Sequence, residues 1–296
     1  MKRFVTAIFM SLGLLLSFGV GNKLYVDSLL RSICDSVNPR NLVFGDSHGE
    51  QIRFPESLNF SHSGDPIAFQ HQCFIKVYPE CHDIQNVMIS AGPHDFASFK
   101  TKRLTDRRSS WLNGNIKRVF AFWNGVGDSN LALDIAYFKG ALSFFKKTDL
   151  LANRAWGTNS NLTEKGLKST LGRHGVKEVG WFAKSNHDLY LSFIQSIETS
   201  GVNHIWIVGT PLHRDYLQRI EAGGWIAYKE SMQKLSLNPQ VQYISLEEAD
   251  LPDEFYKDCD HLNENGHHWL ADTLNSLITE ADIQATGRIA PLTSPK

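Results

Sequence analysis

Short apolar runs recur along the chain, and each ends at or near a glycine or another turn-forming residue. Runs of this length, rich in β-branched side chains, predict buried strands. The five expected strands are Asn41–Phe44, Ser57–Phe60, Asn86–Ser90, His204–Val208 and Val241–Ser245. Stretches with helical periodicity cover Leu24–Ser36, Leu131–Phe145, Trp181–Thr199, Arg214–Leu235 and Gly266–Ile283. Alternating strands and helices predict an α/β domain with a parallel sheet, whose ligands bind beyond the carboxyl ends of the strands.

The first 22 residues differ in pattern from the rest. A short basic start, Met1–Arg3, precedes an apolar run of about 17 residues that ends at Val20. This length favours a membrane anchor that leaves the domain facing the periplasm or the cell exterior, with a cleaved, secreted form as the alternative. The expected organisation is therefore an N-terminal anchor or signal segment (1–22), one domain (23–285) and a flexible tail (286–296).

The interval 96–178 is long for a connection between two strands and is expected to be a helical insertion. It contains a basic cluster, Lys100, Lys102, Arg103, Arg107 and Arg108, and three tryptophans, Trp111, Trp123 and Trp156. Such residues suit a wall for an extended substrate. They equally suit a subdomain with buried tryptophans and solvated charges.

Charge and cysteine content limit the classes of partner. The 30 basic and 31 acidic residues nearly balance, and no block of like charge predicts a nucleic-acid surface. Among four cysteines, Cys73 and Cys81 are close enough to bridge a short loop in an oxidising compartment, or to remain two thiols. Cys259 lies between Asp258 and Asp260, which are expected to raise its pKa and keep it unreactive.

Two distant segments carry the candidate chemistry. Ser47 follows the first strand, and Asp258 and His261 stand three residues apart before the last helix. Serine needs a histidine to take its proton and a carboxylate to orient that histidine. We therefore expect Ser47 as nucleophile, His261 as general base and Asp258 as its partner, with Asp260 as a rival for the last role.

These segments resemble the sequence blocks of the SGNH (GDSL-like) hydrolase superfamily. The residues concerned are Gly45-Asp46-Ser47-His48, Gly64, Gly92-Pro93-His94-Asp95 and Asp258-x-Asp260-His261-Leu262-Asn263. They look most like exported, membrane-anchored bacterial members, many of which are linked to acylation of surface polymers. The resemblance implies a flavodoxin-like three-layer fold with five parallel strands.

The resemblance also implies an oxyanion hole. Its donors would be the backbone N–H groups of Ser47 and Gly64 and a third-block side chain that is asparagine in the family but His94 here. An imidazole N–H can donate a comparable bond, and loss of one such donor costs about 10²–10³ in rate. The change leaves open a member that binds glycan without catalysis.

Another class of protein fits some of the same residues. Asp46, His48, His94 and Asp95 resemble blocks of binuclear metallophosphoesterases, in which mixed histidine and carboxylate ligands hold two metal ions. The remaining blocks of that class are missing, and Asp258–Asn263 would have no role. The favoured prediction is a cofactor-free serine esterase or O-acyltransferase that acts on small, O-acetyl-like esters of a small molecule or surface polysaccharide.

Overall fold

The computed structural model describes residues 27–100, except 29, and residues 156–286. Five parallel strands form one sheet in the order β2-β1-β3-β4-β5. They are β1 (Asn41–Phe44), β2 (Ser57–Asn59), β3 (Asn86–Ser90), β4 (His204–Gly209) and β5 (Val241–Ser245). This order is that of the flavodoxin-like fold. The predicted fold class and all five strands are confirmed, with end points that differ by at most one residue.

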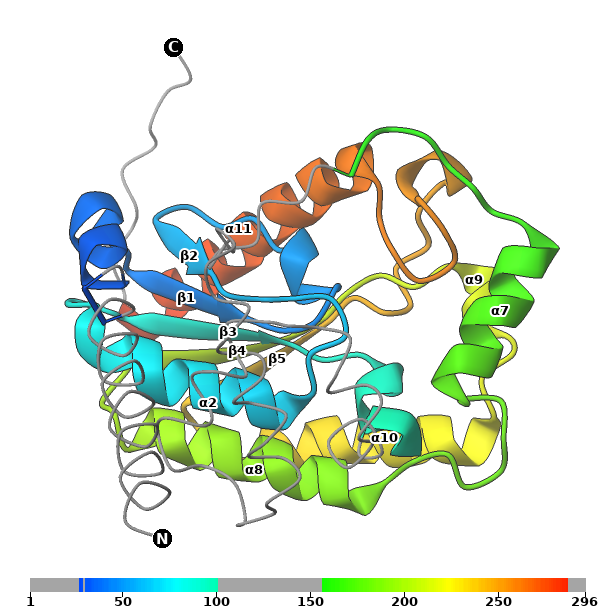
Figure 1. The fold of residues 1–296 in the computed structure, drawn as a ribbon, viewed down its shortest axis with the longest axis horizontal. Coiled ribbons are helices and arrows are strands. Elements are labelled where there is room, and N and C mark those ends of the chain that lie inside the picture. Colours follow the sequence, from blue (N-terminus) through cyan, green and yellow to red (C-terminus); the bar gives the residue numbers. More distant parts are fainter. Residues whose placement is uncertain (1–26, 29, 101–155, 287–296) are drawn as a thin grey trace, which may run out of the picture.

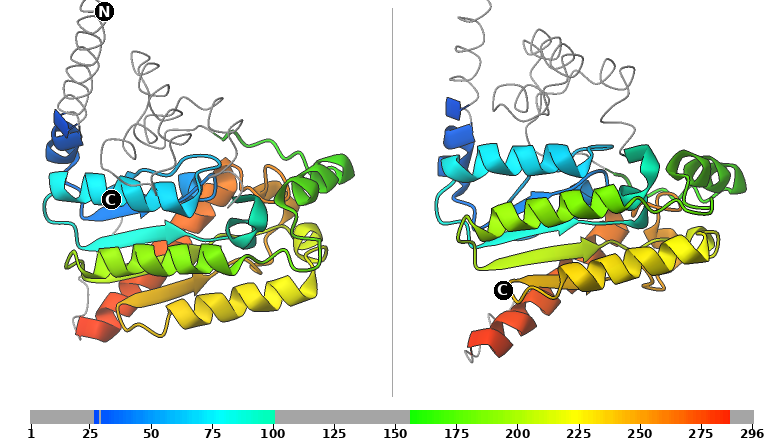
Figure 2. Two further views of the ribbon diagram at one scale, coloured as in Figure 1. Left: turned by 60° about the horizontal axis from the view of Figure 1, so that its bottom comes forward. Right: turned by 90° about the horizontal axis from the view of Figure 1, so that it is seen from below.

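Alternating side chains along each strand divide the core into two layers. Phe44, Ile89 and Ile207 point to the face covered by α2 (Ile67–Val77), α8 (Lys184–Glu198) and α10 (Ala222–Leu235). On the other face, Val43, Met88 and Trp206 pack against Leu270 and Leu274 of α11 (Glu264–Thr286). Figures 1 and 2 show this three-layer arrangement, with α11 crossing the sheet on the side opposite to α8 and α10. Burial of both faces explains why the three central strands, β1, β3 and β4, are almost continuously apolar.

The helices follow the predictions less closely than the strands. The stretch Arg214–Leu235 forms two helices, α9 (Arg214–Leu217) and α10, because the side chain of Glu221 caps α10 through the N–H groups of Gly223 and Gly224. Helix α2 was not predicted. Helix α7 (Glu164–His174), which begins at the Thr163 cap and ends at left-handed Gly175, lies within the expected helical insertion, although its range was not predicted. The described part also contains short 3₁₀ helices: η1 (Gly49–Gln51), η2 (Tyr78–Glu80), η3 (Pro93–Phe96) and η4 (Asp253–Phe255).

Several predictions concern segments outside the described residues. These are the N-terminal anchor, the helix over Leu131–Phe145, Trp111 and Trp123, and most of the tail. The middle of the 96–178 insertion also lies there, whereas its end contains α7. Among the described helices, none combines the length and the apolar character that crossing a membrane requires.

The disulfide is neither of the two alternatives considered for Cys73 and Cys81, a bridge between them or two thiols. Cys34 bonds to Cys81, and Cys73 lies buried in α2 outside the bridge. Cys34 precedes β1 and Cys81 precedes β3, two neighbouring strands, so the bridge lies where these strands begin. Sequence proximity favoured Cys73, but the helix that carries this residue directs it into the core.

Candidate functional site

The turn after β1 fixes the position of Ser47. The Asp46 carboxylate spans this turn by accepting the backbone N–H of His48 at 2.9 Å. Gly45 allows the chain to fold tightly, because a Cβ at this position would lie 2.8 Å from the Cα of Gly49. Ser47 is held close to the surface, with 8% of its area exposed.

Three predicted residues form a continuous hydrogen-bonded row. His261 Nε2 lies 2.9 Å from Ser47 Oγ, and His261 Nδ1 lies 2.9 Å from Asp258 Oδ1. The two segments are 214 residues apart in sequence. The Nε2 nitrogen of the imidazole is thus placed for proton transfer with Ser47, and the Nδ1 nitrogen is placed for orientation of the ring by Asp258.

Local capping explains the shape of the loop before α11. Asp258 Oδ1 also accepts the N–H groups of Asp260 and His261, so the carboxylate holds its own turn. Asn263 accepts from the backbone N–H groups of Asn265 and Gly266 at the start of α11. Asn263 therefore has a structural role that the motif alone did not reveal.

A second carboxylate lies beside the same imidazole nitrogen. Asp260 Oδ1 is 3.4 Å from His261 Nδ1, and Asp260 is only 1% exposed. Burial alone would lower the pKa of His261, but the charge of Asp260 and the hydrogen bond to Asp258 raise it to about 10. Asp260, the rival candidate for the orienting role, thus contacts His261 together with Asp258 and contributes to its raised pKa.

Gln51 joins the two segments and was missed by sequence reasoning. Its side-chain nitrogen donates to the Ser47 carbonyl at 3.3 Å, and its oxygen accepts the Leu262 N–H at 3.0 Å. Nearby, the Arg53 guanidinium binds both carboxylate oxygens of Glu264 at 2.5 and 2.9 Å. No sequence motif marks either contact, because each joins residues 211 positions apart.

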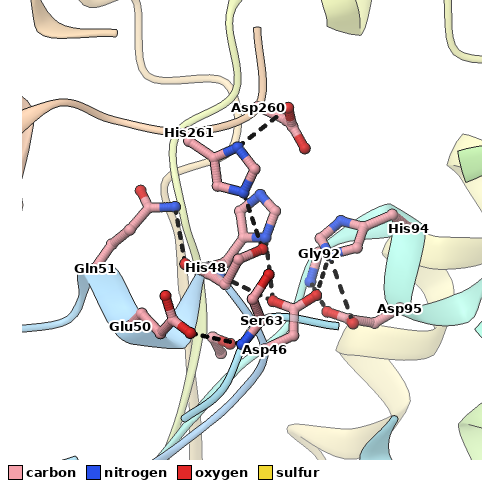
Figure 3. Close-up of polar contacts among 12 residues, drawn as sticks. Asp46, His48, Glu50, Gln51, Ser63, Gly92, His94, Asp95, Asp260 and His261 are labelled. Atoms are coloured by element: carbon pink, nitrogen blue, oxygen red, sulfur yellow. Dashed lines mark hydrogen bonds and ion pairs between the residues drawn. The ribbon is translucent and has the colours of Figure 1, made fainter. Parts of the chain in front are cut away.

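Gly64 lies in the loop after β2, alongside the Ser47 turn. The pairing of β1 with β2 extends beyond the strands, where the His62 N–H donates to the Gly45 carbonyl at 3.1 Å. Glu50 accepts the N–H of Ser63 at 2.6 Å, which fastens this loop to η1 (Figure 3). Gly64 has φ +80°, a conformation that favours glycine.

His94 is bonded to Asp46. Its Nε2 lies 2.8 Å from Asp46 Oδ2, and its Nδ1 faces Gly92, where a Cβ would come within 2.8 Å. In a neutral ring that donates from Nε2, the other nitrogen carries a lone pair and cannot donate. An oxyanion bond from His94 therefore requires the protonated ring, and its oxyanion role stays a prediction.

Buried histidines stack beside the predicted catalytic row. Figure 3 shows the ring of His48 beside those of His261 and His94. The ring centroid of His48 lies 4.8 Å from that of His261 and 4.2 Å from that of His94, and the centroids of His94 and His174 are 4.8 Å apart. Burial and neighbouring imidazoles lower the pKa of His48, and they hold the pKa of His174 well below its usual value. These two rings are therefore neutral at physiological pH.

Lys100 is buried beside Asp46. The expectation that it belongs to a solvated or substrate-facing basic group is therefore wrong. Its ammonium lies 2.6 Å from Asp46 Oδ2 and 2.9 Å from Asp95 Oδ1, and the residue is 3% exposed. Burial opposes both charges, yet the pKa of Lys100 is raised by Asp46 and Asp95. The pKa of Asp46 is held well below its usual range by Lys100 and His94.

Three of the four residues predicted as metal ligands in the alternative interpretation lie close together. One potential ligand atom from each of Asp46, His48 and His94 lies within 4.8 Å of the others. However, the Lys100 ammonium bridges Asp46 to Asp95, the fourth expected ligand. An ammonium paired with both carboxylates disfavours the binding of a divalent cation at this position, because the two positive charges repel each other.

Three further residues lie beside the site. Burial and the charge of Asp260 raise the pKa of the Cys259 thiol to about 12, so this thiol is a poor nucleophile, as expected from its neighbours. Trp156 is buried, with its ring 5.2 Å from that of His261. Lys257 lies 4.5 Å above the Trp156 ring.

Comparisons with known proteins do not identify the function of this protein. No protein-family model matches the chain, and no curated protein matches it. Among solved structures, the chain is similar to "a putative platelet activating factor from Streptococcus pneumonia", with 12% identity and a TM-score of 0.44 over 91% of this chain and 98% of that chain. Similarity at this level does not assign an activity.

Proposed function

We propose that the protein is a serine esterase or O-acyltransferase of the SGNH type, which forms an acyl-enzyme on Ser47. The observation that carries this proposal is the contact of 2.9 Å between Ser47 Oγ and His261 Nε2, continued by the contact of 2.9 Å to Asp258. A serine, an imidazole and a carboxylate in this order are the parts of an activated nucleophile.

The proposed reaction has two halves. Ser47 Oγ attacks the ester carbonyl carbon while neutral His261 takes the hydroxyl proton. The tetrahedral intermediate then breaks its bond to the alkoxy oxygen, which leaves as an alcohol with the proton from His261. Water or a sugar hydroxyl next gives a proton to His261 and attacks the acyl carbon, which releases acid or a new ester and restores the Ser47 hydroxyl.

The intermediate needs donors for its negative oxygen. We assign the backbone N–H groups of Ser47 and Gly64, and His94 when its ring is protonated. Support for the first two comes from the extended β1–β2 pairing and from the Glu50–Ser63 bond, which hold the two loops together. Such preorganised donors contribute a large share of catalysis in acyl transfer.

The proposed substrates are small, O-acetyl-like esters on a small molecule or a surface polysaccharide. An exported, membrane-anchored domain is part of the proposal, since the Cys34–Cys81 disulfide suits an oxidising compartment. The mechanism needs no cofactor.

A binuclear metallophosphoesterase is the second candidate, because Asp46, His48 and His94 gather potential metal ligands. The Lys100 ammonium at Asp46 and Asp95 makes it the weaker one. The two candidates differ in whether a metal chelator abolishes reactivity.

A fluorophosphonate probe tests the proposal, because it phosphonylates only an activated serine. We expect an adduct on Ser47, mapped by peptide mass spectrometry, that forms equally well with chelator. Ser47→Ala should abolish this adduct, and His261→Ala should slow its formation by at least about 10³-fold. The matched control His268→Ala removes an exposed histidine from α11 and should label at the wild-type rate.

The opposite results identify the alternatives. Phosphatase activity that disappears with chelator, without a Ser47 adduct, would favour the metallophosphoesterase. A folded protein that neither labels nor turns over would favour a glycan-binding domain without catalysis.

A further inference from the structure

The buried ion cluster below Ser47 has no part in the proton transfers proposed above. It consists of Asp46, Asp95, Lys100, His48 and His94, all of them at most 4% exposed. Isolated charges in such an environment are costly, and their retention needs compensating contacts. Every charged member of the cluster has such a partner within 3 Å.

Lys100 connects two loops that follow neighbouring strands. Asp46 belongs to the turn after β1, and Asp95 belongs to η3 after β3. Asp95 Oδ2 in turn accepts the Gly92 N–H at 2.9 Å. The Lys100 ammonium, in contact with both carboxylates, therefore fastens the Ser47 turn to the η3 loop.

The Asp46 carboxylate transmits this contact to Ser47. Its Oδ2 accepts from Lys100 and His94, while its Oδ1 accepts from the backbone and the ring of His48. The bond to the His48 backbone closes the turn around Ser47, so the carboxylate's orientation controls the direction of the Ser47 N–H and hydroxyl.

We infer that Lys100 is a positioning residue: its ammonium is a built-in cation that takes the place of a metal ion between Asp46 and Asp95 and so aligns Ser47 with His261. Its two carboxylate partners and the two imidazoles that contact Asp46 are ligand types that also bind Zn²⁺ or Co²⁺. A raised pKa keeps Lys100 charged at all physiological pH values.

If the Lys100 ammonium takes the place of a metal ion, the cluster should bind metal only when this ammonium is removed. The wild-type cluster should not bind Co²⁺, because the ammonium contacts both carboxylates. Lys100→Leu removes the charge without adding a metal-binding atom, so the variant should bind one Co²⁺ and show its visible absorption. Asp46→Asn in the Lys100→Leu background should abolish that absorption.

The same variant tests positioning, in an arm that rests on the proposed Ser47 chemistry. Lys100→Leu, measured without metal, should lower the rate of Ser47 labelling by about 10²-fold, the cost of a small misplacement of a reacting group. Lys184→Leu is the matched control: Lys184 is exposed, pairs with Asp188 on α8 and should change neither readout.

A variant that fails to fold needs a second test. Lys100→Leu with Asp95→Asn removes one positive and one negative charge together. If only this pair folds and it labels slowly, compensation of charge is supported. Labelling of this pair at the wild-type rate would show that the charge does not position Ser47.

The outcomes separate the two proposals. Wild-type labelling of Ser47 together with undiminished labelling of Lys100→Leu overturns the role of Lys100 alone. Co²⁺ bound by the wild-type cluster and lost in Asp46→Asn also overturns it. Absence of labelling in the wild type contradicts the esterase proposal, while the Co²⁺ measurement still tests the place of Lys100.

Discussion

Two carboxylates lie beside one ring nitrogen of His261. Their effect on the pKa of His261 should determine how the reactivity of Ser47 depends on pH. Asp258 and Asp260 lie 2.9 and 3.4 Å from Nδ1, and together they raise the pKa of His261 to about 10. Below that pH the ring is protonated and cannot accept the Ser47 proton. Reactivity of Ser47 should therefore increase with pH up to about 10.

Asp260→Asn tests this relation at the residue scale. Removing the charge lowers the pKa of His261, so the midpoint of the profile of labelling rate against pH should move to lower pH. Asp253→Asn, which changes an exposed carboxylate of η4, should leave the midpoint in place. A wild-type midpoint near 6.5, the ordinary value for histidine, would contradict the assignment.

The strands and their ends were predictable, whereas the contacts between loops were not. Apolar runs bounded by turn formers located all five strands, and the parallel topology then placed Ser47 and His94 at one edge of the sheet. Gln51 lies outside any motif, and Lys100 was grouped with a basic cluster of exposed or substrate-facing residues. The roles of both depend on partners that only the folded chain brings near. Hydrophobic periodicity likewise does not predict the Glu221 cap that separates α9 from α10, because the cap depends on a polar side chain.

At the scale of elements, Gln51 in η1 should determine how well the Ser47 turn is aligned with the loop before α11. Gln51→Leu removes its bonds to Ser47 and Leu262 and leaves buried backbone groups without these partners. We expect the free energy of unfolding to fall by about 1–3 kcal/mol. The labelling rate of Ser47 should fall by about 10-fold, since alignment is part of the barrier.

Denaturant unfolding and labelling kinetics separate these two effects. Gln240→Leu is the control, because Gln240 donates to the Val202 carbonyl just before β4 and β5 begin, at the opposite edge of the sheet. It should lower stability without slowing the labelling of Ser47. Equal labelling by the two leucine variants would mean that Gln51 contributes only to stability.

At the scale of the whole molecule, the disulfide and the candidate site lie at opposite edges of one sheet. The Cys34–Cys81 bridge lies where β1 and β3 begin, and the Ser47, His94 and His261 loops meet where the strands end. This division is typical of parallel α/β sheets, where loops at the carboxyl edge carry the function. The pairing of Cys34 with Cys81 escaped prediction because it depends on this three-dimensional arrangement and not on proximity in sequence.

An acyl group trapped on Ser47 tests the proposed chemistry most directly. The protein would be mixed with an aryl acetate at alkaline pH and quenched in acid, and the acetylated peptide would be identified by mass spectrometry. We expect acetyl-Ser47 in the wild type, with or without chelator, and none in Ser47→Ala or His261→Ala. Turnover of the ester at the wild-type rate by Ser47→Ala would contradict the acyl-enzyme mechanism.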